Sequence, residues 1–471
     1  MNDRISAPNV YLYAFQLYHD SQGSDHPLWQ QCEQILAKFT YSYEKLTPHL
    51  VFPTHSHRYC TDLLSDSSLP FNTRNPLIEG FAQPRQIQDS YAVCLNIGCR
   101  EDGTANNLDV SFIENFNPNQ ALLISGDDNF LGQTLIVTAW LTEPNLPDNL
   151  DSLKPLADKC RDSLFSGDSP PSFYRSGKLF GSPIFEYGSL TDLPHCHHLF
   201  VWLLGDKQTD ADFNTCQQEI FNLLFHRHKI IKAFQDSRQI YQELDTEYRT
   251  IEKNMEVLQQ QFAQDTVLTS SQLQELQEQL KQLFCKSVTY TRLLRKLADF
   301  DNTIAINLYN YSEILQKICV MIESDKEELS ILNSFSIKNA PQMRSQIAGD
   351  LGYFRHGTSL IEQAIASIRG IVEIEQARND RAQQIELRNR EKAEKNRDDR
   401  IESKVQAIGV GIAAGAICAS SGTDKLFETL EQNHVPAPLI LWHPFVFSFL
   451  LSGAIALLAA GITGWRTKPK K

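Results

Sequence analysis

Five positions near the end of the chain combine oxygen-bearing side chains with helical spacing. Gln406, Ala413, Ile417, Ser420 and Asp424 recur at intervals that return to one stripe of an α-helix. Amide, hydroxyl and carboxylate oxygens are ligands that suit a hard cation. Asp424, Gln406 and Ser420 are the residues of this stripe whose side chains carry such oxygens. The alternative is that Asp424 only caps a helix and that Gln406 extends to a membrane interface.

The segments that carry this stripe are apolar enough to predict membrane helices. Residues 405–421 and 445–465 have no ionisable side chain other than Cys418, and about 17 to 25 apolar residues span a bilayer core. Gly411 and Gly415 form a small-xxx-small pair, which lets helices pack closely. The alternative is a buried hairpin in a soluble helical domain.

The distribution of charge predicts an orientation for these two segments. Lys and Arg gather before the first segment and after the second, whereas the connection between them has Lys425 as its one basic residue. Because basic flanks stay in the cytoplasm, we expect a multi-pass protein of the inner or plasma membrane with both termini cytoplasmic. The formal net charge of −13 argues against nucleic acid as a partner.

The first 206 residues read as an α/β domain. Short apolar runs rich in β-branched and aromatic residues alternate with Pro, Gly and Asn, which is typical of strands separated by turns. The ten cysteines contain no CxxC pair and are expected to be reduced. We predict a helix at 28–39 and strands at 10–17, 91–97, 121–124, 134–141, 184–187 and 199–204.

After residue 206 the apolar spacing becomes helical. Seams spaced by three and four residues predict helices over 234–262, 273–297 and 304–322 before Asn339 and Pro341 break the pattern. A fourth helix follows, and its dense charge over 378–404 predicts a solvated stalk. The predicted fold class is α+β, with an N-terminal α/β cytoplasmic domain, a long coiled-coil-like helical stalk and two C-terminal transmembrane helices. The predicted segments are 1–206 α/β domain, 207–357 helical region, 358–404 stalk, 405–421 and 445–465 transmembrane helices, 422–444 acidic loop and 466–471 basic tail.

This order of segments resembles the CorA-like family of two-transmembrane divalent cation transporters. The family's Gly-Met-Asn signature is absent, because the corresponding residues 420–424 read Ser-Ser-Gly-Thr-Asp. The resemblance implies five subunits around a pore lined by the first spanning helix, with magnesium-type ions as transported or regulatory ions and no permanently bound cofactor. It makes Gly411 and Gly415 helix-packing residues and Asp424 a metal-binding residue, with Gln406 and Ser420 offering further oxygens. The implied pore-lining residues are Gln406, Ala413, Ile417, Ser420 and Asp424.

Other residues capable of chemistry are less suitably spaced. The adjacent residues 195–198 (His-Cys-His-His) enter a strand, so their side chains alternate between two faces and cannot all reach one ion. His226 and His228 lie on different faces of a helix. Gly177 and Lys178 lack the remaining residues of a phosphate-binding loop. We therefore expect no catalytic residues and no enzymatic activity.

Three functions remain open from the sequence. The first is a CorA-like homo-oligomeric channel or transporter for divalent metal cations. The second is a ligand-gated effector of the same architecture, which permeabilises the membrane when its N-terminal domain binds a small molecule. The third is a membrane-tethered coiled-coil scaffold that conducts nothing.

Overall fold

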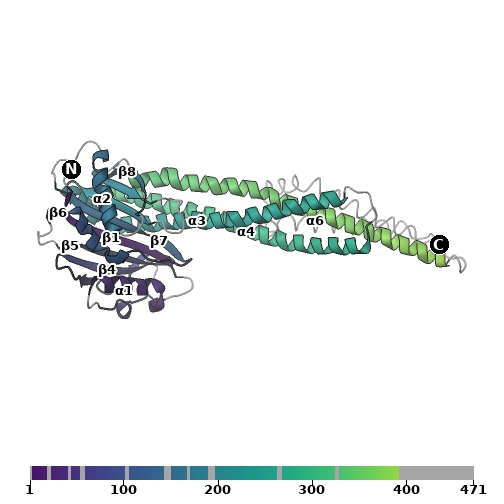
Figure 1. Ribbon diagram of the computed structural model, residues 1–471, viewed down its shortest axis with the longest axis horizontal. Helices are drawn as coiled ribbons and strands as arrows, with labels where there is room; N and C mark the ends of the chain where they lie inside the picture. The colour runs from purple at the N-terminus through teal and green to yellow at the C-terminus, as the bar shows by residue number, and fades with distance from the viewer. Residues whose placement is uncertain are drawn as a thin grey trace. The chain divides into compact units, whose positions relative to one another are not determined.

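The computed structural model describes residues 3–18, 23–40, 44–53, 59–100, 106–142, 150–166, 170–188, 197–262, 268–323 and 328–391. Contacts divide the chain into two compact units. Unit 1 comprises residues 1–239 together with 297–349, and unit 2 comprises residues 240–296 together with 350–471. The sheet belongs to unit 1, whereas the described part of unit 2 is helical (Figure 1).

The described strands of unit 1 form one ten-stranded mixed sheet. Its order is β2-β4-β5-β1-β7-β10-β9-β8, with β3 paired to β4 and β6 paired to β1. Among these strands β10 runs parallel to β7, and the other pairs are antiparallel. The strands are β1 (Arg4–Leu17), β2 (Cys60–Asp62), β3 (Leu69–Asn72), β4 (Ile78–Ile87), β5 (Ser90–Cys99), β6 (Leu108–Asp109), β7 (Phe130–Leu141), β8 (Phe173–Leu179), β9 (Ser182–Tyr187) and β10 (His198–Leu204).

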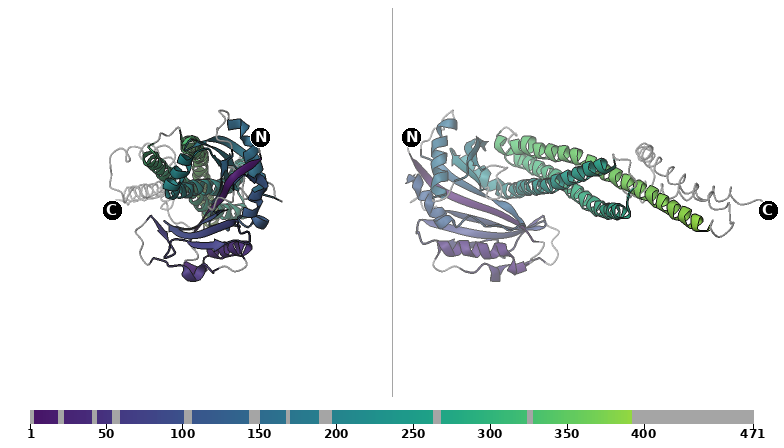
Figure 2. Two further views of the ribbon diagram at one scale, coloured as in Figure 1. Left: turned by 90° about the vertical axis from the view of Figure 1, so that its left-hand side faces the viewer. Right: turned by 45° about the vertical axis from the view of Figure 1, so that its right-hand side comes forward.

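One face of the sheet packs against two short helices. Val10, Leu12 and Ala14 of β1 enter a large core that α1 (Pro27–Phe39) and α2 (Lys154–Leu164) complete. Both views of unit 1 show α1 lying along the sheet (Figure 1 and Figure 2). The described connections between these elements include the 3₁₀ segments η1 (Gly23–Asp25), η2 (Thr47–His49), η3 (Val110–Phe116), η4 (Pro118–Gln120) and η5 (Leu150–Ser152).

The opposite face packs against helix α3 (Lys207–Phe262). Because side chains alternate along a strand, Tyr13 and Phe15 of β1 point away from the α1 core. Their ring centroids lie 6.0 and 5.2 Å from that of Phe221 on α3. Burial on both faces explains why a central strand such as β10 is buried at every position.

Long helices complete both units. These are α4 (Ser270–Met321) and α6 (Ala340–Glu391), and between them lie the short α5 (Ser330–Ser334) and a π-helical turn (Phe335–Asn339). In unit 1 the Tyr311 hydroxyl donates to the Leu332 carbonyl at 2.9 Å. In unit 2 the Tyr290 hydroxyl donates to the Phe354 carbonyl at 2.7 Å, and apolar residues of α4 and α6 share a core cluster. Unit 2 therefore has packing of its own.

Most of the predicted elements are confirmed, and the exceptions have local causes. Residues 121–124 are not a strand, since they follow η4 directly. The prediction omitted β4, in which Gly80 and Pro84 interrupt the apolar alternation. It also omitted α2, β2, β3, β6 and β8. Pro341 does not end a helix. A π-helical turn directly precedes it and accommodates the backbone hydrogen bond that proline, which has no N–H group, cannot donate. The predicted gap between 297 and 304 is also absent, and α4 is continuous there.

The predicted fold class is wrong in its two transmembrane helices, and the predicted membrane localisation is wrong with it. Among the described residues no helix is both long enough and apolar enough to cross a bilayer. Each long helix carries charged side chains along its length, as the residues of α6 up to Glu391 illustrate. Hydropathy detected the apolar stretches 405–421 and 445–465, which lie outside the described residues together with the loop, the tail and most of the charged part of the stalk.

Two glycines of α6 provide a matched test of the packing in unit 2. A Cβ atom at Gly357 would lie 2.3 Å from the Tyr290 hydroxyl oxygen and 2.8 Å from a Tyr248 ring carbon, whereas one at Gly352 would meet nothing within 4 Å. Gly357→Ala should lower the free energy of unfolding by about 1–3 kcal/mol through overpacking. Gly352→Ala should raise it by about 0.5–1 kcal/mol through helix propensity. Denaturant titration measures both, and equal effects would contradict this packing.

Candidate functional site

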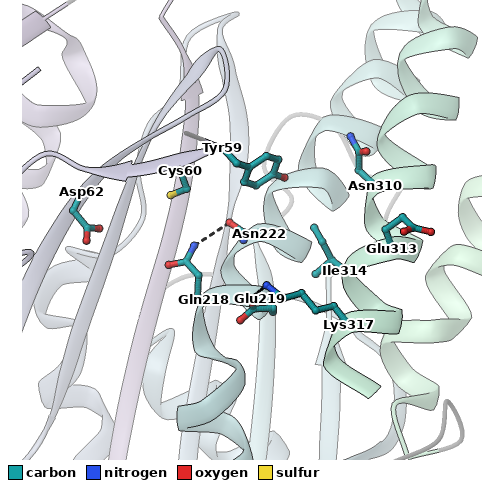
Figure 3. A pocket seen from close by; sticks show the side chains of 10 residues that line it. All are labelled: Tyr59, Cys60, Asp62, Gln218, Glu219, Asn222, Asn310, Glu313, Ile314 and Lys317. Atoms are coloured by element: carbon teal, nitrogen blue, oxygen red, sulfur yellow. Dashed lines mark hydrogen bonds and ion pairs between the residues drawn. The ribbon is translucent and has the colours of Figure 1, made fainter. Parts of the chain in front are cut away.

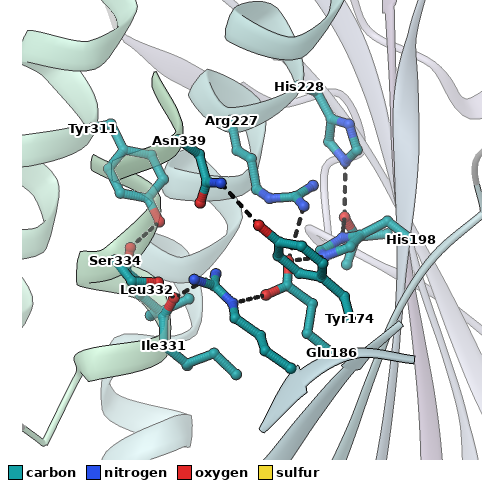
Figure 4. Close-up of polar contacts among 12 residues, drawn as sticks. Tyr174, Glu186, His198, Arg227, His228, Tyr311, Ile331, Leu332, Ser334 and Asn339 are labelled. Atoms are coloured by element: carbon teal, nitrogen blue, oxygen red, sulfur yellow. Dashed lines mark hydrogen bonds and ion pairs between the residues drawn. The ribbon is translucent and has the colours of Figure 1, made fainter. Parts of the chain in front are cut away.

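Glu186 is a carboxylate buried beneath α3, with its side chain 1% exposed. It lies on β9 between Phe185 and Tyr187, which point into the α1 core, so strand alternation directs Glu186 toward the helices. Arg175 Nε donates to one carboxylate oxygen at 2.5 Å. Arg227 Nη2 and His198 Nε2 donate to the other oxygen at 3.0 and 3.1 Å. Figure 4 shows this network between the sheet and the helices.

A threonine extends the network to a second histidine. Thr134 Oγ1 lies 2.8 Å from His198 Nδ1 and 2.8 Å from His228 Nε2. Burial, together with the charge of Arg227, lowers the pKa of His198 to about 4 and the pKa of His228 well below its usual value. Both rings are therefore neutral. Since His198 Nε2 donates to Glu186, the Thr134 hydroxyl donates to His198 Nδ1 and accepts from His228 Nε2.

The balance of charge in the network keeps Glu186 ionised. Burial alone would raise the pKa of Glu186, but the hydrogen bond from His198 and the charges of Arg227 and Arg175 outweigh it and lower the pKa to about 2. Arg175 Nη2 also donates to the Ile331 carbonyl at 2.7 Å. The Arg227 guanidinium lies 5.3 Å from the centre of the Phe335 ring. The network thus anchors α3 and the segment around α5 to the sheet.

An open cleft of about 580 Å³ lies beside the edge of the sheet. The segment leading into β2 contributes Tyr59, and helices α3 and α4 supply the opposite wall (Figure 3). Polar side chains dominate this lining. The lining residues are Tyr59, Cys60, Asp62, Gln218, Glu219, Asn222, Asn310, Glu313, Ile314 and Lys317.

Another buried histidine, His226, connects the cleft to both helices. His226 of α3 donates from Nδ1 to Asn307 Oδ1 of α4 at 2.7 Å, and its Nε2 accepts a hydrogen bond from the Tyr59 hydroxyl. Burial lowers the pKa of His226 to about 4 and raises the pKa of Tyr59 above its usual value. The three residues form a neutral relay in which Tyr59 is a hydrogen-bond donor rather than a phenolate nucleophile.

The cleft is acidic. Among its described lining residues, three carboxylates face one lysine. Asp62 accepts from Arg85 Nε at 2.9 Å, and Glu219 pairs with Lys317 at 2.5 Å. The Glu219 side chain is 9% exposed whereas that of Lys317 is 62% exposed. The buried Glu219 is therefore paired with a solvent-exposed lysine, Lys317. Glu313 adds a further negative charge at the rim of the cleft.

None of the residues singled out from the sequence as a candidate site is among the described residues that line this cleft. Gln406, Gly411, Ala413, Gly415, Ile417, Ser420 and Asp424 lie outside the described residues, so the pore and Asp424 metal site stay predictions. Within the described ranges no group of three or more His, Cys, Asp or Glu side chains is arranged to hold a metal ion. Gly177 lies inside β8 and pairs with Ile184, which is not the geometry of a phosphate loop.

Sequence reasoning missed the residues that the fold brings together here. Glu186 stands alone as a charge in an otherwise apolar strand, which was the available signal for a buried and paired carboxylate. Its partner Arg227 stands between the two histidines already noted on α3. The cleft gave no local signal, because residues 59–62, 218–222 and 310–317 come from three distant parts of the chain.

Replacing Glu186 tests the network. Glu186→Gln leaves two guanidinium groups without their buried counter-charge and should lower the free energy of unfolding by about 3–5 kcal/mol. The matched control is Glu79→Gln, since Glu79 pairs with Arg100 at 3.6 Å with its side chain 52% exposed. The control should change stability by less than about 0.5 kcal/mol. Denaturant unfolding measures the free energy of unfolding of both variants. A decrease of less than about 1 kcal/mol for Glu186→Gln would contradict the anchoring.

The neutral histidines predict sensitivity to acid. A histidine with a native pKa of about 4 takes up its proton in the unfolded chain first, near the usual value of 6.5. Its contribution to stability is therefore lost as the pH falls from 6.5 toward 4. Glu186, whose pKa is also lowered, loses its contribution only at still lower pH.

We expect His198→Gln to flatten the pH dependence of stability. Between pH 7.5 and pH 5 the variant should lose about 2 kcal/mol less than the wild type, because one shifted titration is removed. Denaturant unfolding at the two pH values measures the difference. Parallel losses in the two proteins would show that His198 is charged in the native state.

Comparison with known proteins identified no relative: no family model, no curated protein and no solved structure matches this chain. The resemblance to CorA-like transporters therefore stays a prediction.

Proposed function

We propose that unit 1 is a ligand-binding domain that senses a small organic cation, an amine or a guanidinium compound. The observation that carries this proposal is the acidic cleft, whose walls come from the segment entering β2 on one side and from α3 and α4 on the other. A ligand in such a cleft contacts three parts of the fold at once. This proposal develops the ligand-binding component of the second function left open by the sequence.

The chemistry of the lining favours a cation. A ligand ammonium or guanidinium group can pair with Glu313 and take the place of Lys317 beside Glu219. Such charge-assisted hydrogen bonds contribute about 1.5–3 kcal/mol each. The amides of Gln218 and Asn222, which bond to one another at 3.0 Å, add neutral hydrogen-bonding groups. A phosphate or carboxylate ligand meets an excess of negative charge.

The relay behind the cleft supports sensing. Tyr59 lines the cleft and also bonds His226, which in turn bonds Asn307. A ligand that moves Tyr59 alters a hydrogen-bonded contact between α3 and α4. Binding then favours one arrangement of the helices over another, which is what a ligand needs to shift a conformational equilibrium.

The same groups are poorly suited to catalysis. Burial raises the pKa of Tyr59 and the pKa of Cys60, so neither side chain is an activated nucleophile. His226 is neutral, and both its nitrogens are engaged within the relay. These features favour binding over a covalent reaction in the cleft.

Calorimetric titration of the full chain tests the proposal. Agmatine and spermidine should bind, whereas AMP and inorganic phosphate should not. Glu313→Gln should weaken amine binding by about tenfold, because loss of one ion pair costs about 1.4 kcal/mol. Glu256→Gln is the control, since Glu256 is an exposed glutamate of α3 outside the cleft. Binding of the anions instead, or equal amine affinity in both variants, would refute the proposal.

A further inference from the structure

Unit 1 has a further cavity on the side of the sheet that α1 covers. Its volume is about 490 Å³, within the roughly 300–1,000 Å³ that is typical of small-molecule sites. Its lining comes from the end of α1, the turn between β3 and β4, the segments η3 and η4, and the chain just after α2. None of its described lining residues also lines the acidic cleft. This cavity is therefore an independent candidate site.

One group of lining residues presents cations and hydrogen-bond donors. The Arg74 backbone N–H donates to the Phe39 carbonyl at 2.9 Å, which holds the β3–β4 turn against the end of α1. This contact brings Arg74 and Asn75 to the part of the cavity where Lys38 lies. Asn75 Oδ1 accepts from the Leu77 backbone N–H at 3.1 Å, so its Nδ2 group is the side-chain group left to donate to a ligand. Lys38 is exposed and pairs with no described carboxylate.

The other group of lining residues presents hydrogen-bond acceptors. Glu114 Oε1 accepts from the Ser166 hydroxyl at 3.2 Å, which leaves Oε2 able to accept from a ligand. Asn115 Nδ2 donates to the Phe112 carbonyl at 2.9 Å, so its Oδ1 is the side-chain atom that can bind a ligand. Asn119 lies in the left-handed region, with φ of 51° and ψ of 36°. Non-glycine residues held in this conformation cluster at ligand sites.

The separation of donors from acceptors defines the chemistry of a ligand. Two cations, Lys38 and Arg74, match a phosphate monoester with its two negative charges better than they match a single carboxylate. The acceptors Glu114 and Asn115 match hydroxyl groups, which donate. Among the described lining residues the one aromatic side chain, Phe39, is 3% exposed. A nucleobase therefore finds no ring on which to stack.

We propose that this cavity binds a phosphorylated sugar. Its phosphate lies at Lys38 and Arg74, and its hydroxyl groups donate to Glu114 and Asn115. A guanidinium has five N–H donors, so Arg74 binds phosphate oxygens while it keeps its contact with the Ala37 carbonyl. This site prefers an anion, whereas the acidic cleft prefers a cation.

Calorimetric titration of the full chain with glucose 6-phosphate and fructose 6-phosphate tests the proposal. We expect binding of at least one of them, with affinity at least about tenfold higher than for glucose, inorganic phosphate or AMP. If neither sugar phosphate binds, the proposal is overturned. Equal affinity for inorganic phosphate overturns the sugar contacts, equal affinity for glucose overturns the phosphate contacts, and equal affinity for AMP overturns the choice of a sugar phosphate over a nucleotide.

Three variants locate the site. Lys38→Gln should weaken sugar phosphate binding by about tenfold, because one charge-assisted hydrogen bond is lost. Lys207→Gln is the matched control, since Lys207 is an exposed lysine of α3 outside the cavity. Glu313→Gln, which alters the acidic cleft, should leave the affinity unchanged.

Two results for these variants would overturn the proposal. They are equal affinity in Lys38→Gln and the wild type, and a loss of affinity in Glu313→Gln, which would assign the ligand to the cleft. The binding of amines at the cleft does not enter this test, so each of the two proposals stands or fails separately.

Discussion

The ion pairs of Glu186 are the interaction on which the described architecture of unit 1 depends. A buried carboxylate is costly unless charges and hydrogen bonds compensate it, and here Arg175, Arg227 and His198 do so together. Each partner comes from a different element. The requirement to keep them together fixes α3 on the sheet and holds the segment at Ile331 against β8.

This anchoring fixes the position of α3, which forms part of the helical wall of the neighbouring cleft. One turn of α3 carries both Arg227, which binds the buried carboxylate, and His226, which faces Tyr59 and Asn307. The helix position is set by the closed network, while Tyr59 stands at an open surface. A ligand in the cleft therefore acts on the relay without competing for Glu186.

Local patterns of the sequence predicted much of unit 1 but little of its site. The fully apolar β10 and the amphipathic α1 are specified by nearby residues. Strand β4 was missed because Gly80 and Pro84 disturb its alternation. Hydropathy predicted membrane helices that the described residues do not contain. The cleft depends on contacts such as Tyr59 with His226, 167 positions apart, which no local pattern encodes.

The central claim is that an organic cation binds between the sheet edge and helices α3 and α4. Hydrogen–deuterium exchange of the full chain, with and without saturating spermidine, tests it most directly. The account predicts slower exchange at 59–62, 218–222 and 310–317, the three segments that line the cleft. Slower exchange confined to other segments, or no change at all in these three, would contradict it.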